Sequence, residues 1–250
     1  MSKTPNNKRP LEADEASRSK RRRRGNKSRE EENDLLDMDL KVNQLFKNAD
    51  SQLIADYYLR QLTRFGADLS PIELADLIIS ANAIKDTSSW TKDRVTESLP
   101  EFLESFTENP RELLKAAKAK GTPHTIVVSG AGLRSADIIR SLRKFQSKSC
   151  TIAKLFAKHM KVAEQVEFLG KHQVGLCVGT PSRLTELIEN GALKLDKLER
   201  IIVDASYIDQ KKRGVMDMKD TMMPLAKCLT HKNLQGRYLD EKSPVSLVFY

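Results

Sequence analysis

Residues 173–207 limit the fold of this chain more than any other stretch, because they contain a complete strand–helix–strand pattern. Residues 174–178 form an apolar run without charge, which is typical of a strand buried on both faces. Thr180 and Pro181 follow at positions that suit the cap and the first residue of a helix. Residues 198–204 predict a second buried strand, which ends on the carboxylate Asp204. This βαβ pattern predicts a parallel sheet with a helix crossing over it.

The same alternation continues on both sides of this segment. Further predicted strands cover 125–129, 150–156 and 246–250, and further predicted helices cover 133–145, 162–169 and 218–229, the last interrupted near Pro224. Five strands with intervening helices form an α/β fold, a three-layer sandwich around a parallel sheet. We therefore expect a single α/β domain over residues 121–250.

Residues 34–120 predict helices rather than strands. The predicted helices cover 35–46, 53–65, 71–79 and 110–120. The third begins with a capping box formed by Ser70 and Glu73 around Pro71. The pattern leaves open whether this helical segment packs on the sheet or on a partner.

Residues 1–33 are polar and charged, with too few apolar side chains to offset the entropy of ordering, so we expect a disordered tail. Residues 1–29 hold 11 Lys and Arg against 3 Asp and Glu, a net charge of +8, whereas the other 221 residues carry +1. Two basic clusters resemble a bipartite nuclear localisation signal and suit contacts with RNA phosphates. They consist of Lys8, Arg9, Lys20, Arg21, Arg22, Arg23 and Arg24.

Composition also argues against several classes of protein. Cys150, Cys177 and Cys228 are far apart and form no C-x-x-C pair, so neither a disulfide framework nor a zinc site is indicated. The histidines show no metal-ligand spacing. No apolar run approaches the roughly 18 residues of a membrane span, and the N-terminus lacks the apolar core of a secretory signal. We expect no metal, no membrane association and a reducing compartment.

Three motifs resemble the first RecA-like domain of DEAD-box RNA helicases. Residues 178–184, VGTPSRL, match the GTPxRL segment of that family, and 202–207, IVDASY, occupy the place of its Walker B strand and DEAD box. Residues 129–135, SGAGLRS, occupy the place of its PTRELA motif. The resemblance implies that the turns after these strands hold an RNA backbone. The implied RNA-binding residues are Thr180, Pro181, Ser182, Arg183, Gly130, Gly132 and Arg134.

The catalytic elements of such a helicase are missing from the sequence. An ATPase of this class needs G-x-x-x-x-G-K-[ST], but the one Gly-Lys pair, Gly170 and Lys171, is not followed by Ser or Thr. At the DEAD position only Asp204 remains, as a degenerate Walker B residue, because Ala205 replaces the catalytic glutamate. We also expect no second RecA-like domain. We expect no ATPase and no helicase activity.

The glycines after the first predicted strand support an alternative. Gly130 and Gly132 form half of the Rossmann G-x-G-x-x-G fingerprint, with Ser135 at the third position. A nucleotide- or dinucleotide-binding enzyme is therefore one alternative function. A nuclear adaptor without RNA contact is a second. The glycines also suit a tight strand-to-helix turn with no ligand.

A degenerate helicase-like domain, a helical segment before it and a basic tail together resemble the Cms family of nucleolar proteins. That family is associated with the U3 snoRNA-containing small-subunit processome, the 90S pre-ribosome. The resemblance implies a non-enzymatic ribosome biogenesis factor that acts in 18S rRNA maturation. Its implied partners are processome proteins and pre-rRNA or U3 snoRNA, without a cofactor or a small-molecule substrate, in the nucleus and nucleolus.

Overall fold

The computed structural model describes residues 33–157, 160–242 and 244–250, and a five-stranded parallel sheet lies at its centre. The strands are β3 (Thr125–Val128), β4 (Thr151–Leu155), β5 (Val174–Gly179), β6 (Arg200–Val203) and β7 (Ser246–Phe249). Their order across the sheet is β4-β5-β3-β6-β7. Each coincides with a predicted strand, so the predicted α/β fold with a parallel sheet is confirmed.

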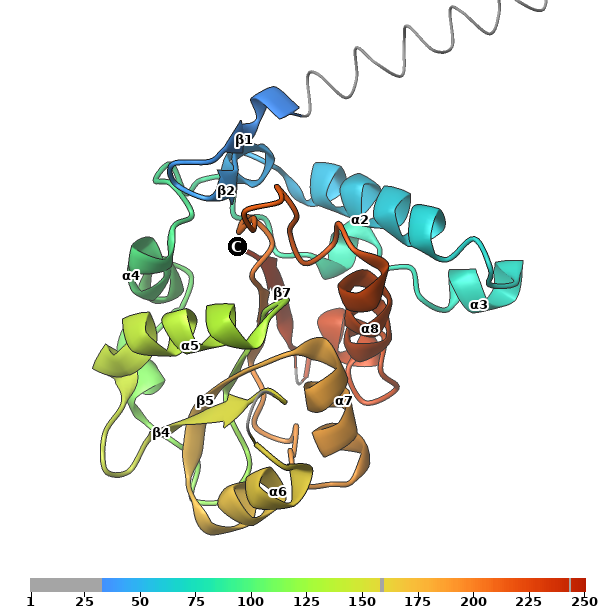
Figure 1. Cartoon of the computed structure of the whole chain (residues 1–250). Helices are drawn as coiled ribbons and strands as arrows, with labels where there is room; N and C mark the ends of the chain where they lie inside the picture. The colour runs from blue at the N-terminus through green and yellow to red at the C-terminus, as the bar shows by residue number, and fades with distance from the viewer. Residues whose placement is uncertain (1–32, 158–159, 243) are drawn as a thin grey trace, which may run out of the picture.

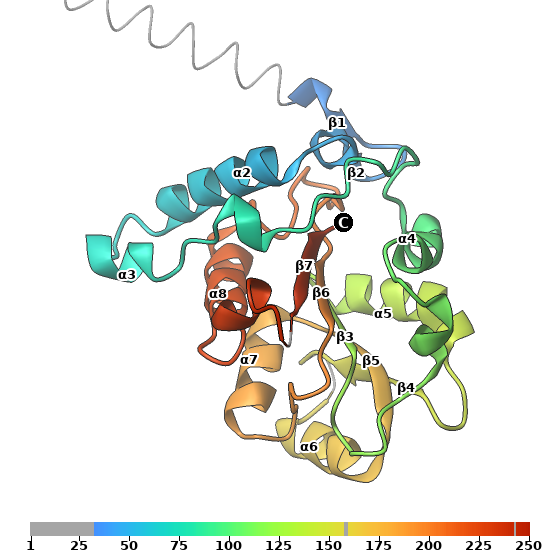
Figure 2. The same cartoon turned by 180° about the vertical axis from the view of Figure 1, so that it is seen from behind.

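Helices cover both faces of the sheet, as Figures 1 and 2 show. One face carries α2 (Ser51–Phe65), α6 (Val162–Lys171), α7 (Pro181–Glu189) and α8 (Lys219–Leu229), and the other carries α4 (Leu99–Ser105) and α5 (Gly132–Ser141). Strand side chains alternate between the two layers. In β3, Ile126 and Val128 join the first hydrophobic cluster, whereas Val127 joins the second. The three-layer arrangement follows from this alternation.

The predicted helices of the sheet domain are present, with one difference. A 3-10 helix, η5 (Leu142–Phe145), continues α5, and another, η6 (Gln235–Tyr238), follows α8. The predicted interruption of α8 near Pro224 is wrong, because the helix runs through this residue. The carbonyl that loses its hydrogen bond belongs to Asp220, which lies on the exposed first turn, where water can bond to it.

The segment before the sheet contains less helix than predicted. Besides α2 and α4 it holds β1 (Leu36–Asp37), β2 (Val42–Asn43), α3 (Pro71–Ala75) and the 3-10 helices η1 (Gln44–Lys47), η2 (Ala81–Ala83), η3 (Thr96–Ser98) and η4 (Pro110–Leu114). The helix predicted over 35–46 is wrong, since β1 and β2 form an antiparallel hairpin. The Asp37 carboxylate accepts the N–H groups of Asp39 and Leu40, at 3.0 and 2.9 Å, and so stabilises a turn in place of a helix.

Two further helices are shorter than predicted. The capping box of Ser70 and Glu73 is present, but α3 ends at Ala75 instead of Ile79. Leu77 and Ile79 are buried on either side of an exposed Ile78, the two-residue alternation of extended chain. The helix predicted over 110–120 is only the 3-10 turn η4.

The segment before the sheet packs on this chain's own sheet. Tyr58 of α2 is fully buried, lies edge-on to Phe249 with ring centroids 6.4 Å apart, and belongs to the same cluster as the sheet residues. Lys85 donates its N–H to the carbonyl of Leu247 at 2.8 Å, so residues 84–85 cover the free edge of β7. The two segments therefore share one core.

His124, just before β3, provides a pH test of this core. Burial, with Arg200 as a second cause, lowers the pKa of His124 to about 4, so the folded protein holds the imidazole neutral. The unfolded chain binds a proton near pH 6.5, so stability is lost as the pH falls from 7 towards 4. Between pH 7 and 5 we expect a loss of about 2 kcal/mol in urea unfolding. His124→Gln should remove most of this loss; an unchanged pH profile in the variant would contradict the assignment.

Candidate functional site: the carboxyl edge of the sheet

All five strands point the same way, so their carboxyl ends meet at one edge. Ligands of open parallel sheets bind in the crevice outside this edge. The residues after the strand ends are 129–132 after β3, 180–183 after β5, 204–207 after β6, and Tyr250 after β7. Because β3 pairs with β5 and β6, the three predicted motifs lie on neighbouring strand ends. The three motifs that the sequence singles out therefore lie together at this edge of the sheet.

Asp204, the residue of the degenerate Walker B motif, forms a buried ion pair within the chain. Arg134 of α5 donates from Nε to Asp204 Oδ2 at 2.8 Å and from Nη2 to Oδ1 at 2.7 Å. The two side chains are 6% and 2% exposed. The Arg134 guanidinium also lies 4.2 Å from the Tyr207 ring centroid and donates to the Thr96 hydroxyl. This carboxylate is neutralised, and no face of it is left open to a metal or a water.

Arg134, which the sequence predicts as an RNA contact, is buried in this ion pair. An RNA phosphate would have to displace Asp204 to reach its guanidinium, leaving a buried carboxylate without a partner. Burial acts to lower the pKa of Arg134, but the Asp204 charge raises it beyond its ordinary value. Through this pair Arg134 joins α5 to the end of β6 and helps to close the carboxyl edge of the sheet.

A strap of residues 87–96 covers the ends of β6 and β7. Arg94 is 2% exposed and donates to the Phe249 carbonyl at 2.9 Å and to the hydroxyl of Thr87 at 3.0 Å. Ser206 donates its hydroxyl to the Arg94 carbonyl, and Tyr250 donates its hydroxyl to the Val95 carbonyl. Burial lowers the pKa of Arg94 to about 10, so it remains charged at neutral pH. No described carboxylate pairs with this guanidinium.

The β1–β2 hairpin forms the second part of the cover. Asn43 donates its N–H to the Ser206 carbonyl at 2.7 Å, and Ile208 donates to the Lys41 carbonyl at 3.0 Å. Val42 and Tyr207 form an antiparallel bridge between these hydrogen bonds. Figure 1 shows the hairpin beside the end of β7. The loop that would carry a DEAD box is therefore paired with the chain's own N-terminal segment.

A cleft remains between the hairpin, the strap and α5. Its volume is about 790 Å³, and it is lined by Asp39, Leu40, Lys41, Val42, Val95, Thr96, Glu97, Pro100, Arg134, Asp137, Arg140, Ser141 and Tyr207. Asp137 and Arg140 form an ion pair with each other. The lining mixes apolar side chains with charges of both signs, which suits a protein surface better than a phosphate group.

The turn after β5 is built as predicted, but its arginine faces inward. Thr180 occupies the cap of α7 and Pro181 its first position, although the Thr180 side chain makes no capping bond. Arg183 is 9% exposed and donates to Gln165 Oε1 at 2.7 Å and to the Met160 carbonyl at 3.1 Å. Ser182 is exposed. Among the four predicted residues of this turn, only Ser182 is fully open to solvent.

The turn after β3 is also held by internal contacts. The hydroxyls of Ser129 and Ser135 lie 2.6 Å apart across it. A Cβ on Gly130 would lie 3.4 Å from Val215, so the segment after β6 packs directly on this glycine. Neither Gly130 nor Gly132 has a positive φ. Gly130 therefore lies in close contact with the backbone of the segment after β6.

The remaining predictions can be placed briefly. Gly170 and Lys171 lie at the end of α6 and not in a strand-to-helix turn, so they do not form a phosphate loop. Cys150, Cys177 and Cys228 are free and buried. The basic clusters at 8–9 and 20–24 lie outside the described residues. Among the residues that the structure describes, no His, Cys, Asp and Glu cluster could hold a metal ion, and no helix is long and apolar enough to cross a membrane.

Two residues that shape this edge were not predicted from the sequence. Arg94 has no carboxylate partner among the described residues and lies 155 residues from the carbonyl it binds. Gln165 donates to the carbonyls of Lys154 and Phe156 and accepts from Arg183, so it joins the end of β4 to α7. A polar residue at an apolar helix position was the available signal for Gln165. For Arg94 we find no local signal.

Fold and site define an α/β protein of the open parallel-sheet class whose ligand-binding edge is closed by its own chain. A family model described as CMS1, U3-containing 90S pre-ribosomal complex subunit, matches residues 2–250, and the chain belongs to this family, whose members are named for a complex of ribosome biogenesis.

Proteins named CMS1 or CMSS1 are similar over much of the chain. Protein CMS1 of Chaetomium thermophilum is 51% identical over 97% of this chain and 96% of its own length. Human protein CMSS1 is 32% identical over 68% of this chain and 56% of its own length. Among solved structures, a DEAD box protein from Methanococcus jannaschii matches 63% of this chain and 37% of its own, with 14% identity and a TM-score of 0.39.

Proposed function

We propose that this chain is a non-enzymatic subunit of the 90S pre-ribosome that acts in 18S rRNA maturation by docking to proteins and contacting RNA. The family assignment supports a role in this complex. The observation that carries the non-enzymatic part is the closed carboxyl edge. A nucleotide would need the space that the strap, the hairpin and the Arg134–Asp204 pair occupy.

The chemistry of the edge agrees with this proposal. Asp204 is paired, Ala205 stands where the helicase family has its glutamate, and no phosphate loop occurs in the sequence. No group is left there to bind a nucleotide-bound magnesium ion or to orient water. The shape of the sheet is retained, while its chemistry is replaced by internal ion pairs and hydrogen bonds. Such a domain offers rigid surfaces to partners.

The predicted RNA contacts divide into two groups under this proposal. Ser182 is exposed, and Thr180, Gly130 and Gly132 are half-buried on adjacent strand ends, so these four keep direct contact with an RNA backbone as their proposed role. Pro181, Arg134 and Arg183 are buried and act by shaping the turns. The basic clusters between Lys8 and Arg24 are proposed to direct the chain to the nucleolus and to add phosphate contacts.

Affinity purification of the tagged full chain after nuclease treatment tests the proposal. We expect small-subunit precursor proteins to be recovered, because protein docking does not depend on intact RNA. As a control, calorimetry with millimolar ATP and NAD should show no binding, since Asp204 is paired and the sequence has no phosphate loop. Recovery of no precursor proteins would rule out the proposed role, and saturable nucleotide binding would revive the enzyme alternative.

A further inference from the structure

A second pocket lies between the β1–β2 hairpin, α2 and the loop of residues 209–217. Its volume is about 360 Å³, within the range of small-ligand sites. Its floor is a hydrogen-bonded group centred on Asp217. Tyr57 donates its hydroxyl to Asp217 Oδ1 at 2.6 Å, Gln61 donates from Nε2 to the same oxygen at 3.1 Å, and the Gly214 N–H donates to Oδ2 at 2.7 Å. We call this site the α2–loop pocket.

One polar atom of this floor has no partner. Gln61 is 6% exposed, and its Oε1 atom is buried without a hydrogen bond among the described residues. Exchanging the positions of the amide oxygen and nitrogen would not satisfy both atoms, because Nε2 donates to the Asp217 carboxylate in the present orientation. A buried acceptor without a donor costs about 1–3 kcal/mol, which a bound donor would recover. The α2–loop pocket therefore lacks a hydrogen-bond donor.

Two cations at the rim of the pocket have no ion-pair partner among the described residues. Arg64 and Lys212 are exposed, and neither forms an ion pair with a described residue. Lys212 is held in place by a tight turn, in which its φ is 60° and the Asp209 carboxylate accepts the N–H groups of Lys211 and Arg213 at 2.8 and 3.0 Å. Lys211 and Lys212 are both exposed in this turn, while Arg213 is neutralised by Asp209. The turn therefore fixes the backbone of Lys212 at the rim of the pocket.

A ligand that suits this site carries negative charge and a hydrogen-bond donor together. A nucleotide of single-stranded RNA does so, through its phosphate and through a base amine or 2′-hydroxyl.

We propose that the α2–loop pocket binds a nucleotide of single-stranded RNA. Arg64 and Lys212 meet its phosphates, and Gln61 Oε1 accepts a hydrogen bond from its base or its 2′-hydroxyl. The choice of RNA as ligand rests on the proposed function, whereas the location of the site rests on the orphan acceptor and the unpaired cations. This surface differs from the turns after β3 and β5.

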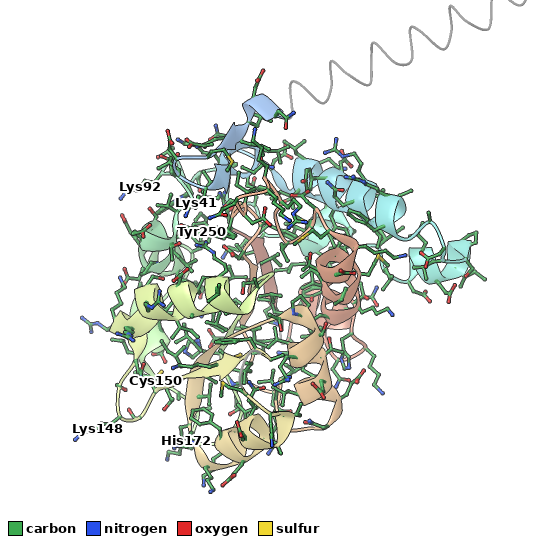
Figure 3. The ribbon with its side chains drawn as sticks, viewed as in Figure 1. Lys41, Lys92, Lys148, Cys150, His172 and Tyr250 are labelled. Atoms are coloured by element: carbon green, nitrogen blue, oxygen red, sulfur yellow. The ribbon has the colours of Figure 1, made fainter. Side chains whose placement is uncertain are left out.

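Fluorescence anisotropy with a short single-stranded RNA and the full chain tests the site. The double variant Arg64→Glu and Lys212→Glu should weaken binding by roughly tenfold and reduce the salt slope by about 1.4, for two lost phosphate contacts. The matched control is Arg143→Glu and Lys148→Glu, which makes the same change of charge at two other exposed, unpaired cations. Figure 3 shows Lys148 at the far end of the molecule from Lys41, which bonds to the loop before the pocket. The control should weaken binding by no more than about twofold.

Three outcomes would overturn the proposal. Equal losses in both double variants would mean that only the overall charge matters. A loss confined to Ser182→Asp would place the RNA at the turn after β5. Capture of a polyglutamate peptide, and not RNA, through Arg64 and Lys212 would make the pocket a protein-docking site. Thermal unfolding of each variant verifies that it is folded. Purification after nuclease treatment tests the proposed function separately, so failure of the pocket proposal and failure of the proposed function can be told apart.

Discussion

Replacing Arg134 with methionine is expected to lower the free energy of unfolding by about 3–5 kcal/mol, because it leaves the buried Asp204 carboxylate without its partner. Urea denaturation at neutral pH measures this loss. The double variant Arg134→Met with Asp204→Leu removes both charges and should recover most of the stability, since no lone charge stays buried. The coupling between the two sites follows from the double-mutant cycle.

The same pair of variants separates a structural role from a chemical one. If the carboxylate only stabilises the edge, the double variant should still enter pre-ribosomal particles, as judged by co-sedimentation of the tagged chain. If Asp204 had kept a catalytic function, the folded double variant would be inactive while its stability was restored. A loss below about 1 kcal/mol in Arg134→Met would contradict the buried pair itself.

Gly175→Ala should destabilise the fold by about 2–3 kcal/mol, because the sheet has no room for a methyl group there. A Cβ at this position would lie 2.2 Å from Cys150 Sγ and 3.0 Å from His124 Nε2. Truncating the sulfur, in Gly175→Ala with Cys150→Ala, should recover part of the loss. Differential scanning calorimetry of the two variants and of the unaltered chain provides the measurement.

Gly170→Ala is the matched control and should act in the opposite direction. Gly170 lies exposed in α6 with nothing within 4 Å of an added Cβ, so alanine should stabilise the helix by up to about 1 kcal/mol. This also tests the sequence interpretation of Gly170 and Lys171. A phosphate loop would need the glycine, whereas a helix end benefits from its replacement. Destabilisation by Gly170→Ala would contradict the structure of α6.

The sheet could be predicted because each strand carries its signal locally. The apolar run of β5 and the Pro181 at the start of α7 are visible within a dozen residues. The hairpin of β1 and β2 was missed because its apolar spacing also fits a helix. The hydrogen bonds from Asp37 to its own turn decide the outcome, and a periodicity argument does not contain them.

The positions of the candidate residues in the fold could be predicted, but their hydrogen-bond and ion-pair partners could not. The motif match located Asp204 and Arg183 at the carboxyl edge, and the structure puts both there. Their partners could not be read from the sequence, because Arg134 is 70 residues from Asp204 and Gln165 is 18 residues from Arg183. Whether a charged side chain faces a ligand or another side chain depends on such distant pairs.

The pairing of residues 84–85 with β7 has a consequence for biosynthesis. Residues 84–85 pair with β7 (Ser246–Phe249), and Arg94 donates to the Phe249 carbonyl. More than half of the chain separates the partners in each contact. Contacts of such long sequence separation form late in folding. On the ribosome, the parts of α2 and α4 that contact Phe249 and Tyr250 therefore stay uncovered until β7 has been synthesised. The nascent chain needs protection from aggregation until that final strand adds to the sheet.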